Sequence, residues 1–264
     1  MSSNLMHPSE LAYAFSFTRT QRINGWDEDS FLPAGDAGTD PVTWLTEGET
    51  RLREAGRLVD GSEAGLNFTD QTSAAVLALV DPSLVMLAER KEGEGVRKLT
   101  IHGAGTDFVG LSMREDGLFD MTQYADLTAA AGACSAFLGA ALAPLDRDVR
   151  IEADYDSFAA LRSLAQDDQV AALVALGASE VDATSFSSAL ADPVAAGMLS
   201  VFYCANNEVQ DVEPYTVMTN PDDETWVLFP PASLEAPVVL ERSSIAALTA
   251  RVTVGIAARS IQPE

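Results

Sequence analysis

Few side chains in this sequence are of the kinds that catalyse reactions. There are two histidines: His7 lies beside Pro8, and His102 ends a short apolar run before a glycine turn. A histidine acting as a general base would have to be one of these two. Asp107 could orient His102, but we favour a strand-end histidine with a structural hydrogen bond. The P-loop, nucleophile-elbow and HExxH motifs are absent from the chain.

The cysteines and carboxylates form no metal or cofactor motif. Cys134 and Cys204 lie far apart and are best interpreted as buried apolar residues of a reducing compartment. Gly103-Ala-Gly105 begins like a dinucleotide loop, but Phe108 stands where the third glycine belongs. The densest acidic stretch lacks the central glycine of a calcium loop, and we interpret it as an exposed linker; its members are Asp146, Asp148, Glu152, Asp154 and Asp156. We therefore expect no catalytic residue, no metal and no cofactor, and a protein that is not an enzyme.

The charge balance limits the partners. The chain has 264 residues with 16 Lys+Arg against 40 Asp+Glu, a formal net charge of −24. Such a surface repels nucleic-acid phosphates and anionic lipid head groups, so neither nucleic acid nor membrane is an expected partner. No apolar run approaches the length of a membrane span, and the N-terminus does not resemble a signal peptide. We expect a soluble cytoplasmic protein whose acidity either only solubilises it or keeps an apolar partner in solution.

The elements that would position any site come in two similar sets. The first set is a helix over 43–59, a second helix capped by Asn67 or Thr69 and ended by Asp81-Pro82, four short strands, and an alanine-rich helix over 122–142. We expect the strands at 84–88, 99–102, 108–113 and 118–121, with Asp116-Gly117 as a hairpin turn. The first 42 residues show no regular pattern.

The second set repeats this order. Helices are expected over 155–176 and 184–191, strands at 199–204, 215–219, 226–229 and 238–240, and a last helix from Ser243 or Ser244 to about 258. Leu79-Val-Asp-Pro82 and Leu190-Ala-Asp-Pro193 occupy the same junction in both sets. We predict an α+β fold of two similar helix–antiparallel sheet–helix halves, forming a pseudo-twofold domain with one central sheet. The boundaries are an irregular segment 1–42, a first repeat 43–145 and a second repeat 146–264. Helices would cover one face and leave the other for a partner.

This layout resembles the EspG chaperones of type VII (ESX) secretion. The similarity is greatest from the strand-like Val149–Ile151 through the Trp226 strand to the helix ending near Ile256. It implies a cytosolic, non-enzymatic chaperone that holds the helical tip of a PE–PPE pair. The family's contact stretches would correspond to 91–96, 203–212 and the last helix. The partner-binding candidates are Lys91, Glu92, Glu94, Tyr203, Asn206, Glu208 and Tyr215.

Three functions stay open at this stage. The first is a binding protein of the secretion-chaperone kind with a helical, PE–PPE-like client. The second is a structural or assembly subunit that self-associates. The third is an enzyme that depends on carboxylates and a metal. The chain itself is expected to be a monomer or a homodimer.

Overall fold

The structure is a computed structural model, and it describes residues 4–18, 23–33, 40–60, 66–206, 208–229, 231 and 236–260. Its contacts divide the chain into two compact units. Unit 1 comprises Met1–Met86, Lys98–Ala130 and Phe202–Asp211, and unit 2 comprises Leu87–Arg97, Ala131–Val201 and Val212–Glu264.

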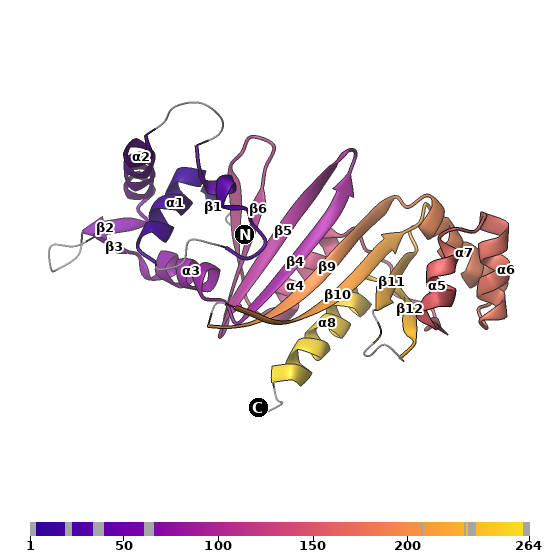
Figure 1. Cartoon of the computed structure of the whole chain (residues 1–264). Coiled ribbons are helices and arrows are strands. Elements are labelled where there is room, and N and C mark those ends of the chain that lie inside the picture. Colours follow the sequence, from indigo (N-terminus) through magenta and orange to yellow (C-terminus); the bar gives the residue numbers. More distant parts are fainter. Residues whose placement is uncertain are drawn as a thin grey trace. The chain divides into compact units, whose positions relative to one another are not determined.

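Ten of the described strands form one sheet, in the order β1-β7-β6-β5-β4-β9-β10-β11-β12-β8 (Figure 1). The bounds are β1 Asn4–Met6, β4 Leu84–Glu92, β5 Gly95–Ala104, β6 Asp107–Met113, β7 Phe119–Tyr124, β8 Arg150–Ala153, β9 Ala195–Ala205, β10 Glu208–Thr219, β11 Thr225–Phe229 and β12 Val238–Ser243. β2 (Leu58–Asp60) and β3 (Leu66–Phe68) form a separate ribbon. The helices are α1 Pro8–Ser16, η1 Glu28–Phe31, α2 Pro41–Glu54, α3 Asp70–Val80, α4 Leu127–Phe137, α5 Tyr155–Leu161, α6 Gln166–Ala175, α7 Glu180–Ala191 and α8 Ile245–Ser260.

The α+β class predicted from the sequence is confirmed. Each half contributes four consecutive strands, β4–β7 or β9–β12, which are followed by α4 or α8. A twofold relation between the halves, and the boundaries 1–42, 43–145 and 146–264, remain predictions. Among the described helices, none is long and apolar enough to cross a membrane.

The N-terminal part of unit 1 covers one face of its strands. The register of β6 and β7 places Leu111 opposite Met121, so both side chains lie on the same face. They belong to a buried cluster that also holds Trp26 and Phe31 from the segment before α2. The ring of Phe31 stacks on that of Phe119, with centroids 5.3 Å apart. This face is therefore closed by the protein's own side chains.

Residues 1–42 were expected to be irregular, but their described part contains three regular elements, β1, α1 and η1, before α2 begins. β1 pairs with β7, and α1 begins after His7, whose backbone N–H donates to Glu10 Oε2 at 2.6 Å. In return His7 Nδ1 accepts the N–H of Ser9 at 3.3 Å. A nine-residue helix is too short for a strong hydrophobic period, and histidine is not one of the usual capping residues. The two signals that predict a helix from sequence, a hydrophobic period and a usual capping residue, were therefore both missing.

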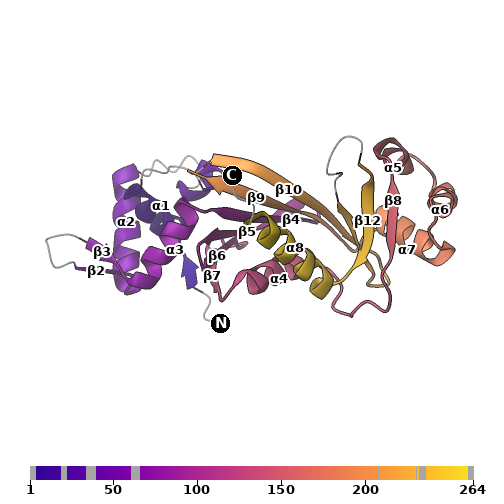
Figure 2. The same ribbon diagram turned by 90° about the horizontal axis from the view of Figure 1, so that it is seen from below.

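Unit 2 covers both faces of its strands, which contradicts the expected single layer of helices. Met218 and Trp226 are paired across β10 and β11 and lie in the cluster packed under α5, α6 and α7. Tyr215, three residues before Met218, faces the other way. There α8 approaches closely: a Cβ atom on Gly255 would lie 3.6 Å from the Tyr215 hydroxyl oxygen. Figure 2 shows α8 lying along the strands and α5–α7 grouped beside β8 and β12.

Several predicted helices have other bounds in the structure. The helix expected over 43–59 spans Pro41–Glu54, residues 58–60 form β2, and the helix expected over 184–191 begins at Glu180. Residues 122–124 belong to strand β7, so the helix expected over 122–142 is shorter and begins at Leu127. The helix expected over 155–176 is two helices, α5 and α6, separated at residues 162–165. Alanine is compatible with every position of a helix, so an alanine-rich run carries no signal for where a helix begins or ends.

Candidate partner-binding surface

The turn between β4 and β5 is an exposed hairpin end in unit 2. All seven residues from 91 to 97 are exposed. The turn depends on Gly93, whose φ of +59° lies in the left-handed region. Arg90 and Arg97 both reach the Glu92 carboxylate, at 3.6 and 3.4 Å. Among the described residues, no carboxylate lies within ion-pair distance of Lys91. The predicted candidates Lys91, Glu92 and Glu94 therefore share one accessible turn.

The turn between β9 and β10 is a second exposed end, in unit 1. Tyr203 is half-buried, Asn206 and Glu208 are exposed, and the backbone of Asn206 is left-handed with φ of 52°. Asparagine tolerates this conformation better than other non-glycine residues. Val209 keeps 49% of its surface exposed although it is a large apolar residue. The structure thus brings Tyr203, Asn206 and Glu208 together at one turn.

Tyr215, the remaining candidate, is buried. Only 1% of its surface is exposed, and its ring packs edge-on against Phe229 at a centroid distance of 5.5 Å. The guanidinium carbon of Arg251 on α8 lies 5.0 Å from the centre of the Phe229 ring. A partner could reach Tyr215 only if α8 moved away. The sequence could not show this, because alternation along β10 tells two faces apart but does not reveal that helices cover both.

The last helix, the third predicted contact stretch, begins as expected. Ser244 caps it by accepting the N–H of Ala247 at 3.2 Å. Its buried side includes Leu248 and Val252, whereas Val254 is 66% exposed. An exposed side of α8 is therefore accessible in unit 2.

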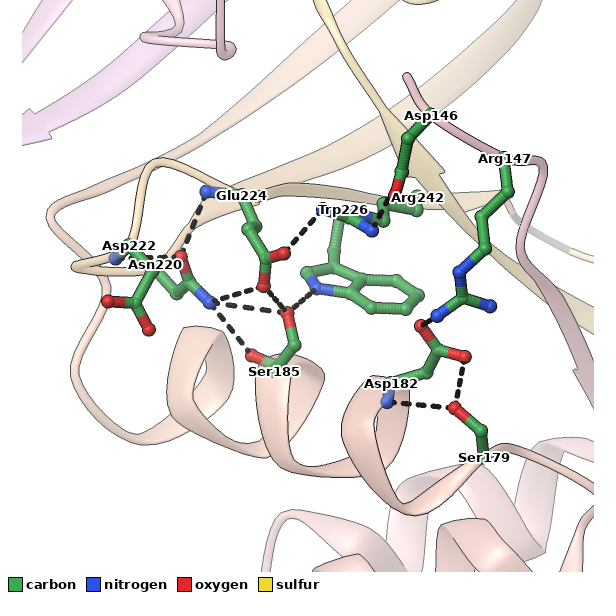
Figure 3. A network of polar contacts seen from close by, with 10 residues as sticks. All are labelled: Asp146, Arg147, Ser179, Asp182, Ser185, Asn220, Asp222, Glu224, Trp226 and Arg242. Carbon is green, nitrogen blue, oxygen red and sulfur yellow. Dashed lines mark hydrogen bonds and ion pairs between the residues drawn. The ribbon is translucent and has the colours of Figure 1, made fainter. Parts of the chain in front are cut away.

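A polar network that the sequence did not reveal joins α7 to the β10–β11 turn (Figure 3). Ser185 Oγ accepts the indole N–H of Trp226 at 2.9 Å and the amide of Asn220 at 3.2 Å, and it donates to Glu224 Oε2. The other Glu224 oxygen accepts from Arg242. These partners are separated by up to 41 residues in the chain. Sequence spacing therefore gives no signal for the network.

The same network continues toward the start of α7. Ser179 caps α7 by accepting the backbone N–H of Asp182 at 3.2 Å. The Asp182 carboxylate accepts from the Ser179 hydroxyl and from Arg147, both at 2.5 Å, and 5% of its side chain is exposed. Asp146 accepts from Arg242 at 3.3 Å. The Ser185 hydroxyl donates to a carboxylate that an arginine already neutralises, and no histidine takes part. The arrangement holds α7, the turn and residues 146–147 together, and it does not activate a nucleophile.

His102 is sealed in the core of unit 1. None of its surface is exposed. Its Nε2 lies 3.1 Å from the hydroxyl of Thr100, which also accepts the indole N–H of Trp26 at 2.8 Å. Nδ1 has no hydrogen-bond partner among the described residues. Burial lowers the pKa of His102 to about 3, so the ring is neutral at physiological pH. The predicted structural hydrogen bond is confirmed, although His102 lies within β5 and not at its end.

The two thiols are buried, and the acidic stretch serves structural roles. Burial raises the pKa of the Cys134 thiol to about 12 and also raises the pKa of Cys204. The acidic stretch at 146–156 is divided among separate roles: Asp154 caps α5, and Glu152 pairs with Arg150 at 2.8 Å. Across the described ranges, no group of three or more His, Cys, Asp or Glu side chains could hold a metal ion.

The comparisons with known proteins identify the fold. No family model matches the chain, and no curated protein matches it. The chain has the fold of a type VII secretion system chaperone. That chaperone is EspG5 of Mycobacterium tuberculosis, solved in complex with the PE25–PPE41 dimer, and the TM-score is 0.64. The identity is 14%, and the match covers 96% of this chain and 95% of the EspG5 chain. The resemblance to EspG noted in the sequence is thus confirmed for the fold.

Proposed function

We propose that this protein is a cytosolic, non-enzymatic chaperone that holds a helical client of the PE–PPE kind before secretion. The observation that carries this proposal is the fold shared with EspG5 over 96% of the chain, because EspG5 was solved with such a dimer bound. The buried, neutral His102 and the two thiols with raised pKa support a binding role over a catalytic one.

The two exposed hairpin ends are the proposed client contacts. They carry Lys91, Glu92 and Glu94 at the β4–β5 turn and Tyr203, Asn206 and Glu208 at the β9–β10 turn. Each end also exposes a valine, Val96 or Val209. An exposed apolar side chain surrounded by polar residues is the usual composition of an interface centre and its rim. Because it is buried under α8, Tyr215 is not part of this proposal.

Capture from the native host tests the function. The full chain, tagged and purified under gentle lysis, should bring down a stoichiometric helical partner encoded beside secretion genes, and light scattering should give the mass of the complex. Val96→Asp and Val209→Asp should each weaken the complex about tenfold, because each places a charge in an apolar contact. Val181→Asp is the matched control, since Val181 is 72% exposed on α7, outside the proposed contacts.

Three results would contradict the proposal. The chain could remain alone in every capture, form a persistent homo-oligomer that excludes all clients, or be stabilised against heat by divalent cations or nucleotides. The second result would favour the self-associating subunit, and the third the carboxylate enzyme.

A further inference from the structure

The few basic residues of this acidic chain are unevenly distributed. Residues 90–98 hold four of the 16 Lys+Arg residues and two glutamates, a net charge of +2. The only two lysines of the chain, Lys91 and Lys98, are both among them. By contrast, residues 163–241 contain no lysine or arginine and 13 Asp+Glu residues. The β4–β5 hairpin end is therefore a local basic site in a protein with a formal net charge of −24.

The structure presents this positive charge outward. Arg90 and Arg97 share the Glu92 carboxylate, so these two guanidinium groups exceed their common partner by one positive charge. Lys91 adds another positive charge against the single exposed carboxylate of Glu94, which leaves the turn with a net positive charge. The side chain of Arg97 is still 55% exposed. Val96, 59% exposed, adds an apolar contact beside these charges. The hairpin end thus combines the accessible ammonium of Lys91, the exposed guanidinium of Arg97 with its ion pair to Glu92, and the small apolar side chain of Val96.

We propose that the β4–β5 hairpin end selects its client by binding an acidic segment of it, with Lys91 and Arg97 facing carboxylates and Val96 packing on an apolar neighbour. This inference rests on the proposed chaperone function and specifies the chemistry of one contact. The acidic remainder of the chain repels such a segment, which confines it to the hairpin end. A client with a basic segment at this point would meet two like charges and be rejected.

The two lysines make the contact unusually accessible to chemical mapping. A carbodiimide joins an amine directly to a carboxylate, and the side-chain amines of this chain are confined to Lys91 and Lys98. The complex of the full chain with its captured client, treated with carbodiimide and analysed by mass spectrometry, should give an intermolecular link from Lys91 to an Asp or Glu of the client. Lys91→Arg should keep the affinity within about twofold, because the charge remains, and should abolish the link.

Charge reversal supplies a second readout. Lys91→Glu should weaken the complex about fivefold and the pair Lys91→Glu with Arg97→Glu about twentyfold, with less effect at high salt. Arg162→Glu is the matched control, because this exposed arginine at the end of α5 gives the same change in net charge outside the hairpin. It should leave the affinity unchanged.

The outcomes separate this inference from the proposed function. A stable complex whose affinity is insensitive to the double reversal overturns the acidic-segment proposal and leaves the chaperone role intact. Links from Lys91 to carboxylates of a second copy of this chain, in place of the client, overturn it in favour of self-association. If the wild-type chain captures no client at all, the proposed function fails, and the inference fails with it.

Discussion

The buried histidine makes the stability of unit 1 depend on pH in a defined direction. His102 has a pKa of about 3 in the folded chain against 6.5 for an unperturbed histidine. The unfolded chain therefore binds a proton below about pH 6.5 that the folded chain does not bind. Folding stability is fully present above that pH and is lost progressively as the pH falls from about 6.5 toward about 3.

The size of the effect follows from these two values. Between about pH 7.5 and pH 5.5, one such histidine reduces the free energy of unfolding by about 1.4 kcal/mol, an order-of-magnitude figure. The substitution to make is His102→Gln, because an amide does not titrate and can still form a hydrogen bond with Thr100. The variant will be less stable at neutral pH, since the smaller side chain packs less well. The informative quantity is therefore how the difference in unfolding free energy between wild type and His102→Gln changes with pH.

Urea unfolding at several pH values between about 5.5 and 7.5 measures that difference. The wild-type advantage should shrink as the pH falls, while contributions from the carboxylates and from His7 cancel because both proteins have them. His7 is a necessary consideration, since burial and the nearby Arg51 lower its pKa too. Two unfolding free energies that stay parallel across this range would refute the reasoning and would mean that His102 is hydrated or charged in the fold.

Three further predictions concern packing and the polar network. Gly48→Ala should cost about 3 kcal/mol in a urea titration, because its Cβ would lie 2.0 Å from the Ser9 carbonyl oxygen where α1 and α2 meet; an unchanged midpoint would contradict it. Ser185→Ala should cost about 1–3 kcal/mol by the same assay, since the buried indole N–H of Trp226 loses its acceptor, and a smaller loss would show that water replaces the hydroxyl. Cys134 should react with a thiol reagent only as the protein unfolds, because it is buried with a pKa of about 12; fast reaction of both thiols in native buffer would disprove this.

Elements marked by strong local signals could be predicted from the sequence. Thr69, one of the two predicted caps, caps α3, and Asp81-Pro82 follows its end as predicted. The Asp116-Gly117 turn lies between β6 and β7, with Gly117 at φ +78°. In each case a single residue fixes the backbone conformation over two or three positions, so the information is local. The repeated order of elements also predicted the α+β class and indicated the resemblance to EspG.

Elements that depend on distant partners could not be predicted. β1 has three residues and exists because it pairs with β7, more than 110 positions away. The interruption between α5 and α6 depends on a partner at shorter range: the amide of Gln169, within α6, donates to the carbonyls of Leu161 and Leu164 at 3.1 and 3.2 Å, eight and five positions earlier. No local pattern marks either feature, because the hydrogen-bond partners that stabilise them are brought together only by the fold.

The burial of Tyr215 changes the kind of surface that a client can use. From the sequence we expected a broad sheet face left open on one side, yet in unit 2 helices cover both faces, and Tyr215 lies under one of them. A broad apolar face would bind many apolar partners, since hydrophobic attraction is not directional. Hairpin ends offer little apolar area, so the proposed function assigns most of the discrimination between clients to a few charged contacts, such as the one proposed for Lys91. Charged contacts at exposed positions favour selectivity over affinity, so the proposed chaperone would bind few clients and hold each through weak individual contacts.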